Sequence, residues 1–277
     1  MSNKSPVVKK RRTSGAAASS AAVATEIESV AHLHSLEPRA LVSVKGILVQ
    51  MPEAVRHVSV RSKGDCMERK AVLDFVVADK SSATQVSFWG PLVDRYYGAL
   101  QDAFDAGAEG ALPQVHLTNV EIVSPKDKVL RPYRKLQSTS RTELTIEKAQ
   151  ILHHQPAAHQ TIANFRDILV TTAPWVGTLV GTIVEVGECR EAVRSGEPIQ
   201  EIKVVDAHNN GLTLIAYAGA TSDPSLAVQK RVAFYFVQAK AGEGSRSGSV
   251  WIFADAWLCE LEEVEEVPSI KQMVDLK

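Results

Sequence analysis

A tryptophan on the polar face of a predicted strand is the first side chain in this sequence that could do chemistry. Residues 71–90, AVLDFVVADKSSATQVSFWG, read as two strands joined by a polar turn. Side chains alternate along a strand, so Val86 and Phe88 share one face and Trp89 lies on the other, polar one. A large ring on such a face can stack on a nucleobase. The alternative is that a neighbouring loop or domain covers Trp89.

A basic loop is the second candidate. Residues 124–141, SPKDKVLRPYRKLQSTSR, hold six cations against one acid, with Tyr133 in the middle. Cations interleaved with an aromatic ring suit a phosphate backbone and a stacked base together. The alternative is a solvated loop whose charges serve solubility. The cations that we expect to contact nucleic acid are Lys126, Lys128, Arg131, Arg134 and Lys135.

The elements that position these residues are mostly strands. Residues 41–50 predict a first strand with a bend at Gly46, and the hairpin supplies the next two strands. Pro91 begins a helix whose apolar residues recur at helical spacing. Residues 115–123 and 143–146 predict the remaining strands. The second half repeats this order at a spacing of about 130 residues, with LVGTIVEV matching VKGILV, which indicates a duplicated domain.

Length, cysteine content and charge restrict the class of protein. A chain of 277 residues predicts two domains. No apolar run approaches the roughly 20 residues of a transmembrane helix. Three scattered cysteines without a CxxC pair favour a reducing compartment. Residues 38–155 carry 16 basic and 13 acidic side chains and residues 156–277 carry 10 and 16, so a polyanion should bind the first half better.

The order of elements is that of an OB-fold, a five-stranded barrel with a helix between its third and fourth strands. Two such units in tandem, the first with VLDFVVADKSSATQVSFWG and a downstream Thr-Glu-Leu-Thr, resemble the paired single-stranded-DNA-binding domains of the replication protein A large subunit. The resemblance implies an all-β chain with short capping helices, built as two tandem OB-fold five-stranded barrels.

The resemblance also implies roles for single residues. Trp89 falls at the stacking aromatic of the third strand, and Tyr133 falls near the second stacking aromatic. Backbone phosphates would be covered by Arg56, Arg61 and Lys63, in the loop between the first two strands.

The second unit departs from the pattern of the family. If Gly219 matches Gly90, then Ala218 replaces the stacking ring and Tyr217 points inward. This alignment predicts that the acidic second barrel binds a strand poorly and provides a surface for protein subunits of a larger complex.

The predicted organisation is a basic, Ser- and Ala-rich disordered tail over residues 1–37, a nucleic-acid-binding OB-fold over 38–150, a linker over 151–163, a second OB-fold over 164–262 and an acidic tail over 263–277. Lys9–Arg12 favours the nucleus, with a loose nucleic-acid-binding arm, a mitochondrial transit peptide or a plain solvated tail as alternatives. The linker histidines lack partners to complete a metal site, so we expect neither metal nor cofactor.

The sequence therefore predicts a non-enzymatic protein that binds single-stranded nucleic acid, DNA before RNA, in replication, repair or telomere maintenance. The alternatives are a single-stranded RNA binder and an OB-fold scaffold subunit of a larger nucleic-acid complex. An enzyme is disfavoured because the phosphate-cradling GxxxxGK[ST], GxSxG and HExxH motifs are missing from the sequence.

Overall fold

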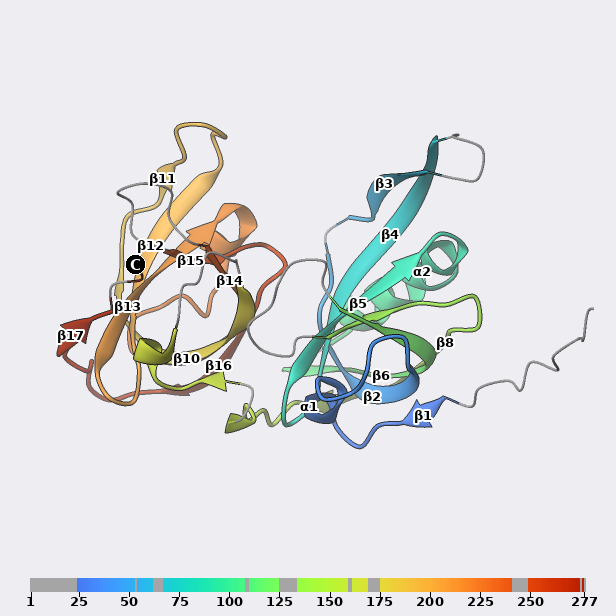
Figure 1. Cartoon of the computed structure of the whole chain (residues 1–277), viewed down its shortest axis with the longest axis horizontal. Helices are drawn as coiled ribbons and strands as arrows, with labels where there is room; N and C mark the ends of the chain where they lie inside the picture. Colours follow the sequence, from blue (N-terminus) through green and yellow to red (C-terminus); the bar gives the residue numbers. More distant parts are fainter. Residues whose placement is uncertain are drawn as a thin grey trace, which may run out of the picture.

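The chain forms two β-barrels that follow one another along the sequence (Figure 1). The structure, a computed structural model, describes residues 24–52, 54–61, 67–107, 110–124, 134–158, 161–168, 175–240, 249–274 and 276. In this part of the chain the α-helices are α1 (Val30–Leu33) and α2 (Pro91–Asp105). No helix among these residues is long and apolar enough to cross a membrane.

The strands of the first barrel are β1 (Thr25–Glu26), β2 (Leu41–Gln50), β3 (Arg56–Arg61), β4 (Met67–Ala78), β5 (Ala83–Trp89), β6 (Ala111–Val123), β7 (Lys135–Gln137) and β8 (Glu143–Ile151). The barrel closes in the order β2–β4–β5–β7–β6, with β6 paired back to β2. β5 and β7 are parallel. β7 and β8 lie end to end against β6, so together they form the fifth strand.

The second barrel consists of β9 (Thr161–Ile162), η2 (Phe165–Asp167), β10 (Trp175–Val186), β11 (Arg190–Glu191), β12 (Pro198–Val205), β13 (Asn210–Tyr217), η3 (Ala218–Ser222), β14 (Lys230–Lys240), β15 (Ser249–Ile252), β16 (Trp257–Glu263) and β17 (Gln272–Met273). It closes in the order β10–β12–β13–β15–β14, again with one parallel pair, β13–β15. Two closed five-stranded rings of this order confirm the prediction of two tandem OB-fold barrels.

Alternation of apolar residues places the core inside each ring. In β5, Val86 and Phe88 are fully buried, as the two-residue period predicts. Phe75 of β4 meets Phe88 edge to face, with ring centroids 5.1 Å apart. α2 begins with Pro91 directly after Gly90 and covers one end of the barrel with Val93 and Leu100. Burial of these side chains from water is the main force that stabilises the barrel.

One aspartate makes the same set of hydrogen bonds in each barrel. The carboxylate of Asp79 accepts hydrogen bonds from the turn after β4 and from the backbone N–H of Val30, 2.7 Å away. The carboxylate of Asp206 does the same after β12 and accepts from the N–H of Phe165, 2.8 Å away. Each aspartate therefore ties the segment that precedes its barrel to the tip of a hairpin.

Two glycines repeat in the same way. A Cβ on Gly46 would lie 2.5 Å from the Val77 side chain and 2.9 Å from the carbonyl oxygen of Ala78. A Cβ on Gly181 would lie 3.0 Å from the carbonyl oxygen of Val205. Both glycines therefore let the first strand of a barrel pass close to the second, which is the bend predicted at Gly46.

The boundaries predicted for the two tails need correction. β1 pairs with β2, and α1 buries Val30 and Leu33 completely, so the first barrel begins well before residue 38. At the other end, β17 pairs with β13, and Leu276 is buried. Both segments supply apolar side chains to a core, which the Ser- and Ala-rich or acidic residues around them conceal in the sequence.

The two barrels pack against each other through a small apolar cluster. It combines Val76, Ala78 and Ala83 of the first barrel with Ala233, Tyr235 and Phe236 of the second. The connecting segment after β8 runs along the β4–β5 turn, because the backbone N–H groups of Gln155 and Ala157 donate to Lys80 and Ser81.

Candidate nucleic-acid interface

Trp89 lies at the end of β5, on the outer face of the first barrel. Its side chain is half-buried, whereas its neighbour Phe88 is fully buried. Its backbone N–H donates to the hydroxyl of Ser138 at 3.1 Å, which fixes the end of the strand. The indole Nε1 is buried and has no hydrogen-bond partner among the described residues. Part of the indole ring therefore remains available at the surface, as the alternation of the strand predicts.

Of the predicted cations, Arg56 shares a strand partner with Trp89. Val72 of β4 pairs with Arg56 on one side and with Trp89 on the other. The guanidinium of Arg56 lies 2.5 Å from Oδ2 of Asp74. The hydroxyl of Ser87 donates to the other oxygen of this carboxylate at 2.6 Å. Asp74 therefore holds Arg56 along the same outer face as Trp89.

Lys135 and Arg134 occupy different environments although they are adjacent in sequence. Burial lowers the pKa of Lys135, and the carboxylates of Asp255 and Asp74 partly oppose this effect. Arg134 instead donates to the carbonyl oxygen of Leu36 at 3.2 Å and to the hydroxyl of Ser124 at 3.0 Å. Lys135 thus lies toward the face of Trp89, while Arg134 ties the segment before β2 to the barrel.

The remaining predicted residues lie at or beyond the ends of described segments. Arg61 is exposed at the end of β3, in a hairpin with β4 that projects from the barrel (Figure 1). The predicted residues outside the described part of the chain are Lys63, Lys126, Lys128, Arg131 and Tyr133. Their roles stay predictions.

Tyr217 in the second barrel is the counterpart of Trp89, which corrects the predicted alignment. In the first hairpin, Trp89 pairs with Val72, six positions beyond the pair Ala78–Ala83 nearest the turn. In the second hairpin, Tyr217 pairs with Ile199, six positions beyond the corresponding pair Val205–Gly211. The next residues, Gly90 and Ala218, both have left-handed backbone conformations, with φ of 56° and 52°. Tyr217 is half-buried on the outer face and does not point inward.

The misalignment arises in the turn between the second and third strands. The backbone hydrogen bond that closes the turn joins Asp79 to Ser82 in the first barrel and Asp206 to Asn210 in the second. The second turn is therefore one residue longer. A one-residue shift exchanges the two faces of a strand, so the predicted alignment puts Tyr217 on the wrong face.

Two further aromatic residues accompany Tyr217. Trp251 and Phe253 are stacked, with ring centroids 5.9 Å apart and an interplanar angle of 9°. Tyr217 meets both rings edge to face, at 6.2 and 5.9 Å. Trp251 and Phe253 follow residues 241–248, which contain no aromatic residue. The alternation of Val250 and Ile252 with these two rings is the signal that could have found them.

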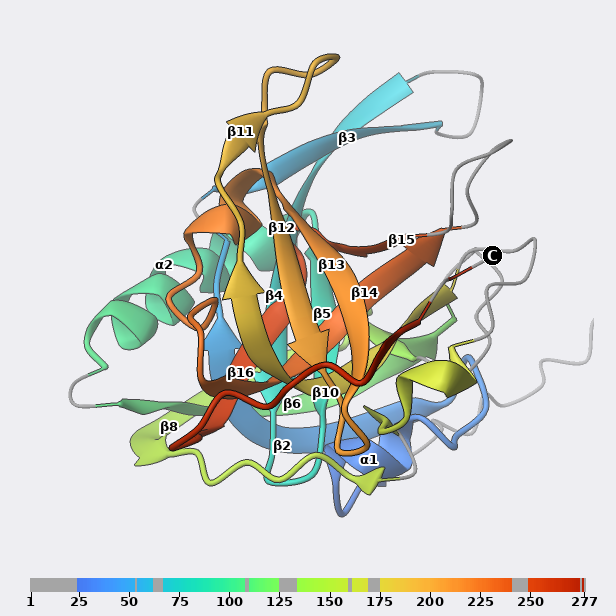
Figure 2. The same cartoon turned by 90° about the vertical axis from the view of Figure 1, so that its left-hand side faces the viewer.

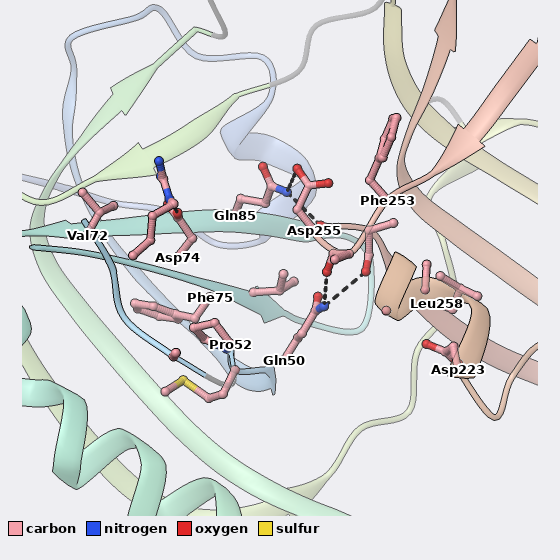
Figure 3. Close-up of a pocket in the computed structure, with 18 residues that line it drawn as sticks. Gln50, Pro52, Val72, Asp74, Phe75, Gln85, Asp223, Phe253, Asp255 and Leu258 are labelled. Carbon is pink, nitrogen blue, oxygen red and sulfur yellow. Dashed lines mark hydrogen bonds and ion pairs between the residues drawn. The ribbon is translucent and has the colours of Figure 1, made fainter. Parts of the chain in front are cut away.

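The second barrel covers part of the outer face of the first. The side-chain amide of Gln85 donates to the carbonyl oxygen of Asp255 at 2.9 Å (Figure 3). The amide of Gln50 donates to the carbonyl oxygens of Ala254 and Ala256, at 3.1 and 3.2 Å. Gln85 is consequently buried, while Trp89, four residues along the same face, is not. The face is thus open at the Trp89 end and closed at the Gln85 end.

The hairpins beside the two aromatic positions project at the same end of the molecule. Both β3–β4 and β11–β12 extend beyond their barrels toward the top of the molecule in two perpendicular views (Figures 1 and 2). In the second hairpin, Arg190 pairs with Glu201 at 2.6 Å.

Solved structures of similar fold include a chain of a replication protein A heterotrimer bound to single-stranded DNA. That match has 15% identity and a TM-score of 0.44 over 83% of this chain and 51% of the other. Fission yeast Pot1 with single-stranded DNA matches with 8% identity and a TM-score of 0.36, over 87% and 90% of the two chains. The p204 HINb domain matches with 8% identity and a TM-score of 0.38, over 81% and 100%.

These likenesses concern the fold alone. The chain spans about half the length of the replication protein A chain that it matches. No protein-family model matches it, and no curated protein sequence does. Among the described residues, no group of three or more His, Cys, Asp or Glu side chains is arranged to hold a metal ion.

Proposed function

We propose that this chain binds single-stranded nucleic acid, DNA in preference to RNA, without catalysing a reaction on it. One observation carries the proposal: the two barrels present a half-buried aromatic side chain, Trp89 and Tyr217, at the same register position of the same outer face. A base has an apolar face whatever its identity, so stacking on these rings tolerates any sequence.

Cations near Trp89 would contact the phosphates of the bound strand. Arg56, which is paired with Asp74, lies across Val72 from Trp89, and Arg61 lies at the end of β3 in the projecting hairpin. Contacts between such cations and phosphates release counterions, so affinity should fall steeply with salt. The proposed role is in DNA replication, repair or telomere maintenance in the nucleus, with further subunits held by the acidic second barrel.

The test is fluorescence anisotropy with labelled oligo-dT of about 20–30 nucleotides at low and moderate salt. Trp89→Ala and Tyr217→Ala should each weaken binding by about 1–3 kcal/mol, because each removes one stacking surface. Trp89→Phe is the matched control: it retains an aromatic ring and should retain most of the affinity. Unlabelled oligo-rU as competitor decides between DNA and RNA.

A scaffold subunit is the second candidate function. The segment from β16 onward exposes Glu260, Glu262, Glu263, Glu265 and Glu266, of which the first two pair with Lys230 and Arg231. An acidic segment of this kind suits a basic protein partner and repels a phosphate backbone. No binding of oligo-dT at low salt would reject the nucleic-acid proposal for this chain alone and favour the scaffold.

A further inference from the structure

A cavity of about 710 Å³ lies where the two barrels meet (Figure 3). One wall comes from the first barrel and includes Val72, Asp74 and Gln85. The opposite wall comes from the second barrel and includes Asp223 and Phe253. Pockets for small molecules have volumes of about 300–1,000 Å³. The cavity is therefore large enough for a nucleobase with its sugar.

The cavity is placed between the two aromatic positions. Val72, in its first wall, is the strand partner of Trp89. Phe253, in its second wall, meets Tyr217 with ring centroids 5.9 Å apart. A strand that stacks on Trp89 and continues to Tyr217 must pass this cavity.

The charges around the cavity suit a base better than a phosphate. Its lining contains the carboxylates of Asp74, Asp223 and Asp255, and among the described residues Arg56 is the lining cation. Arg56 is already paired with Asp74 at 2.5 Å. Lys135 interacts with Asp74 and Asp255 but leaves the acids in excess. Apolar side chains such as Val72 and Phe253 complete the lining, as the faces of a flat ring require.

Hydrogen-bond acceptors also exceed donors in this lining. The amide nitrogen of Gln50 is engaged by the carbonyl oxygens of Ala254 and Ala256. Its Oε1 is buried and has no partner within the described part of the chain. The amide nitrogen of Gln85 is engaged by Asp255. The amide nitrogens of Gln50 and Gln85 are thus already bonded to the second barrel. The buried Oε1 of Gln50 has no hydrogen bond among the described residues, which costs free energy.

We propose that this cavity takes one base of the bound strand and selects bases that carry an exocyclic amino group. Cytosine N4, adenine N6 and guanine N2 can donate to carboxylate and amide oxygens, whereas O4 of thymine or uracil meets these acceptors as a further acceptor. The inference rests on the proposed function and adds a base preference to it.

The test compares oligo-dC with oligo-dU of about 24 nucleotides at about pH 8, by anisotropy on the full chain. These pyrimidines differ only at N3 and position 4, so their ring size, sugar and phosphates are matched. A hydrogen bond to a charged acceptor predicts about tenfold tighter binding of oligo-dC. Asp255→Asn introduces an amide donor and should reduce this ratio toward one. Asp102→Asn, on the exposed side of α2, makes the same charge change away from the cavity and should leave the ratio unchanged.

Each outcome is informative. A preference for oligo-dC that Asp255→Asn or Asp223→Asn reduces, and that Asp102→Asn does not, supports the inference. Equal binding of both oligonucleotides overturns the base preference and leaves the proposed function in place. A preference that both cavity variants retain overturns the assignment to this cavity. Binding of neither oligonucleotide rejects the proposed function itself.

Discussion

The hydroxyl of Tyr235 lies 2.6 Å from Nε2 of His154, and Nδ1 of the same imidazole lies 2.6 Å from the carbonyl oxygen of Asp79. Tyr235 belongs to the second barrel and Asp79 to the first, so one side chain of the connecting segment joins both. A carbonyl oxygen only accepts, so Nδ1 carries the proton and the Tyr235 hydroxyl donates to Nε2 of the neutral ring. Trp257 packs edge-on against the imidazole, with ring centroids 5.1 Å apart.

This arrangement predicts a pH-dependent stability. Burial lowers the pKa of His154 below its ordinary value of 6.5, although the hydrogen bond and the charge of Asp79 oppose the shift. The folded protein then binds this proton less than the unfolded chain does, so the contribution of His154 is complete above about pH 6.5 and is lost as the pH falls below it. The melting temperature of the wild type should fall from about pH 7.5 to about pH 5.5 by more than that of His154→Gln.

His153 provides the control for this measurement, because it is the exposed neighbour of His154. His153→Gln should follow the wild type at both pH values. Parallel pH dependence of the wild type and His154→Gln would show that another group is responsible. Tyr235→Phe keeps the ring but leaves Nε2 without its donor, and should cost about 1 kcal/mol of unfolding free energy at neutral pH.

Asp206 should be a principal determinant of the stability of the second barrel. Burial by itself would raise the pKa of this carboxyl, but hydrogen bonds from Asn210, Phe165 and His208 lower it overall. The contribution is therefore present above about pH 3.8 and lost at lower pH. Asp206→Ala removes four acceptor contacts and should cost about 3 kcal/mol or more in urea denaturation. The exposed Asp167→Ala should cost far less, and equal losses would refute the assignment.

Glycine substitutions should act in opposite directions at two sites. Gly46→Ala places a methyl group 2.5 Å from Val77 and 2.9 Å from a carbonyl oxygen, and should destabilise the first barrel by about 1–3 kcal/mol. Gly98 lies in α2, and a methyl group there would meet nothing within 4 Å, so Gly98→Ala should stabilise by about 0.5–1 kcal/mol. Thermal melts of the two variants give the comparison, and a loss in both would contradict it.

Trp89 and Tyr217 should contribute independently to strand binding. They lie on different barrels, and no ring contact joins them among the described residues. The losses of Trp89→Ala and Tyr217→Ala, each about 1–3 kcal/mol, should add within about 0.5 kcal/mol in the double variant with a long oligonucleotide. With a short oligonucleotide that occupies only the first barrel, Tyr217→Ala should have little effect and Trp89→Ala should have its full effect.

The sequence predicted the features that depend on local pattern. Alternation placed Phe88 inside and Trp89 outside, and the repeated apolar runs indicated two barrels. It did not show that the turn after Asp206 is one residue longer, because polar turn residues give no register signal. Because the prediction missed that residue, its alignment assigned Tyr217 to the inner face of the strand instead of the outer face.

Contacts between distant segments could not be predicted. α1 lies within a Ser- and Ala-rich segment, and its burial depends on packing against a barrel that residues far along the chain complete. The bonds from Gln50 and Gln85 to residues 254–256 join positions about 170–200 residues apart. Polar side chains of this kind are ordinary at a surface, so only the docked structure reveals their role.

The docking of the barrels has a consequence for how the sequence can diverge. The two glutamines bind backbone carbonyl oxygens of Ala254, Asp255 and Ala256, and every residue type offers such an oxygen. Ala254 and Ala256 can therefore change their side chains without loss of these bonds, whereas Gln50 and Gln85 cannot; Asp255 also accepts from Gln85 through its carboxylate. Among homologous sequences, positions 254 and 256 should therefore vary more than positions 50 and 85.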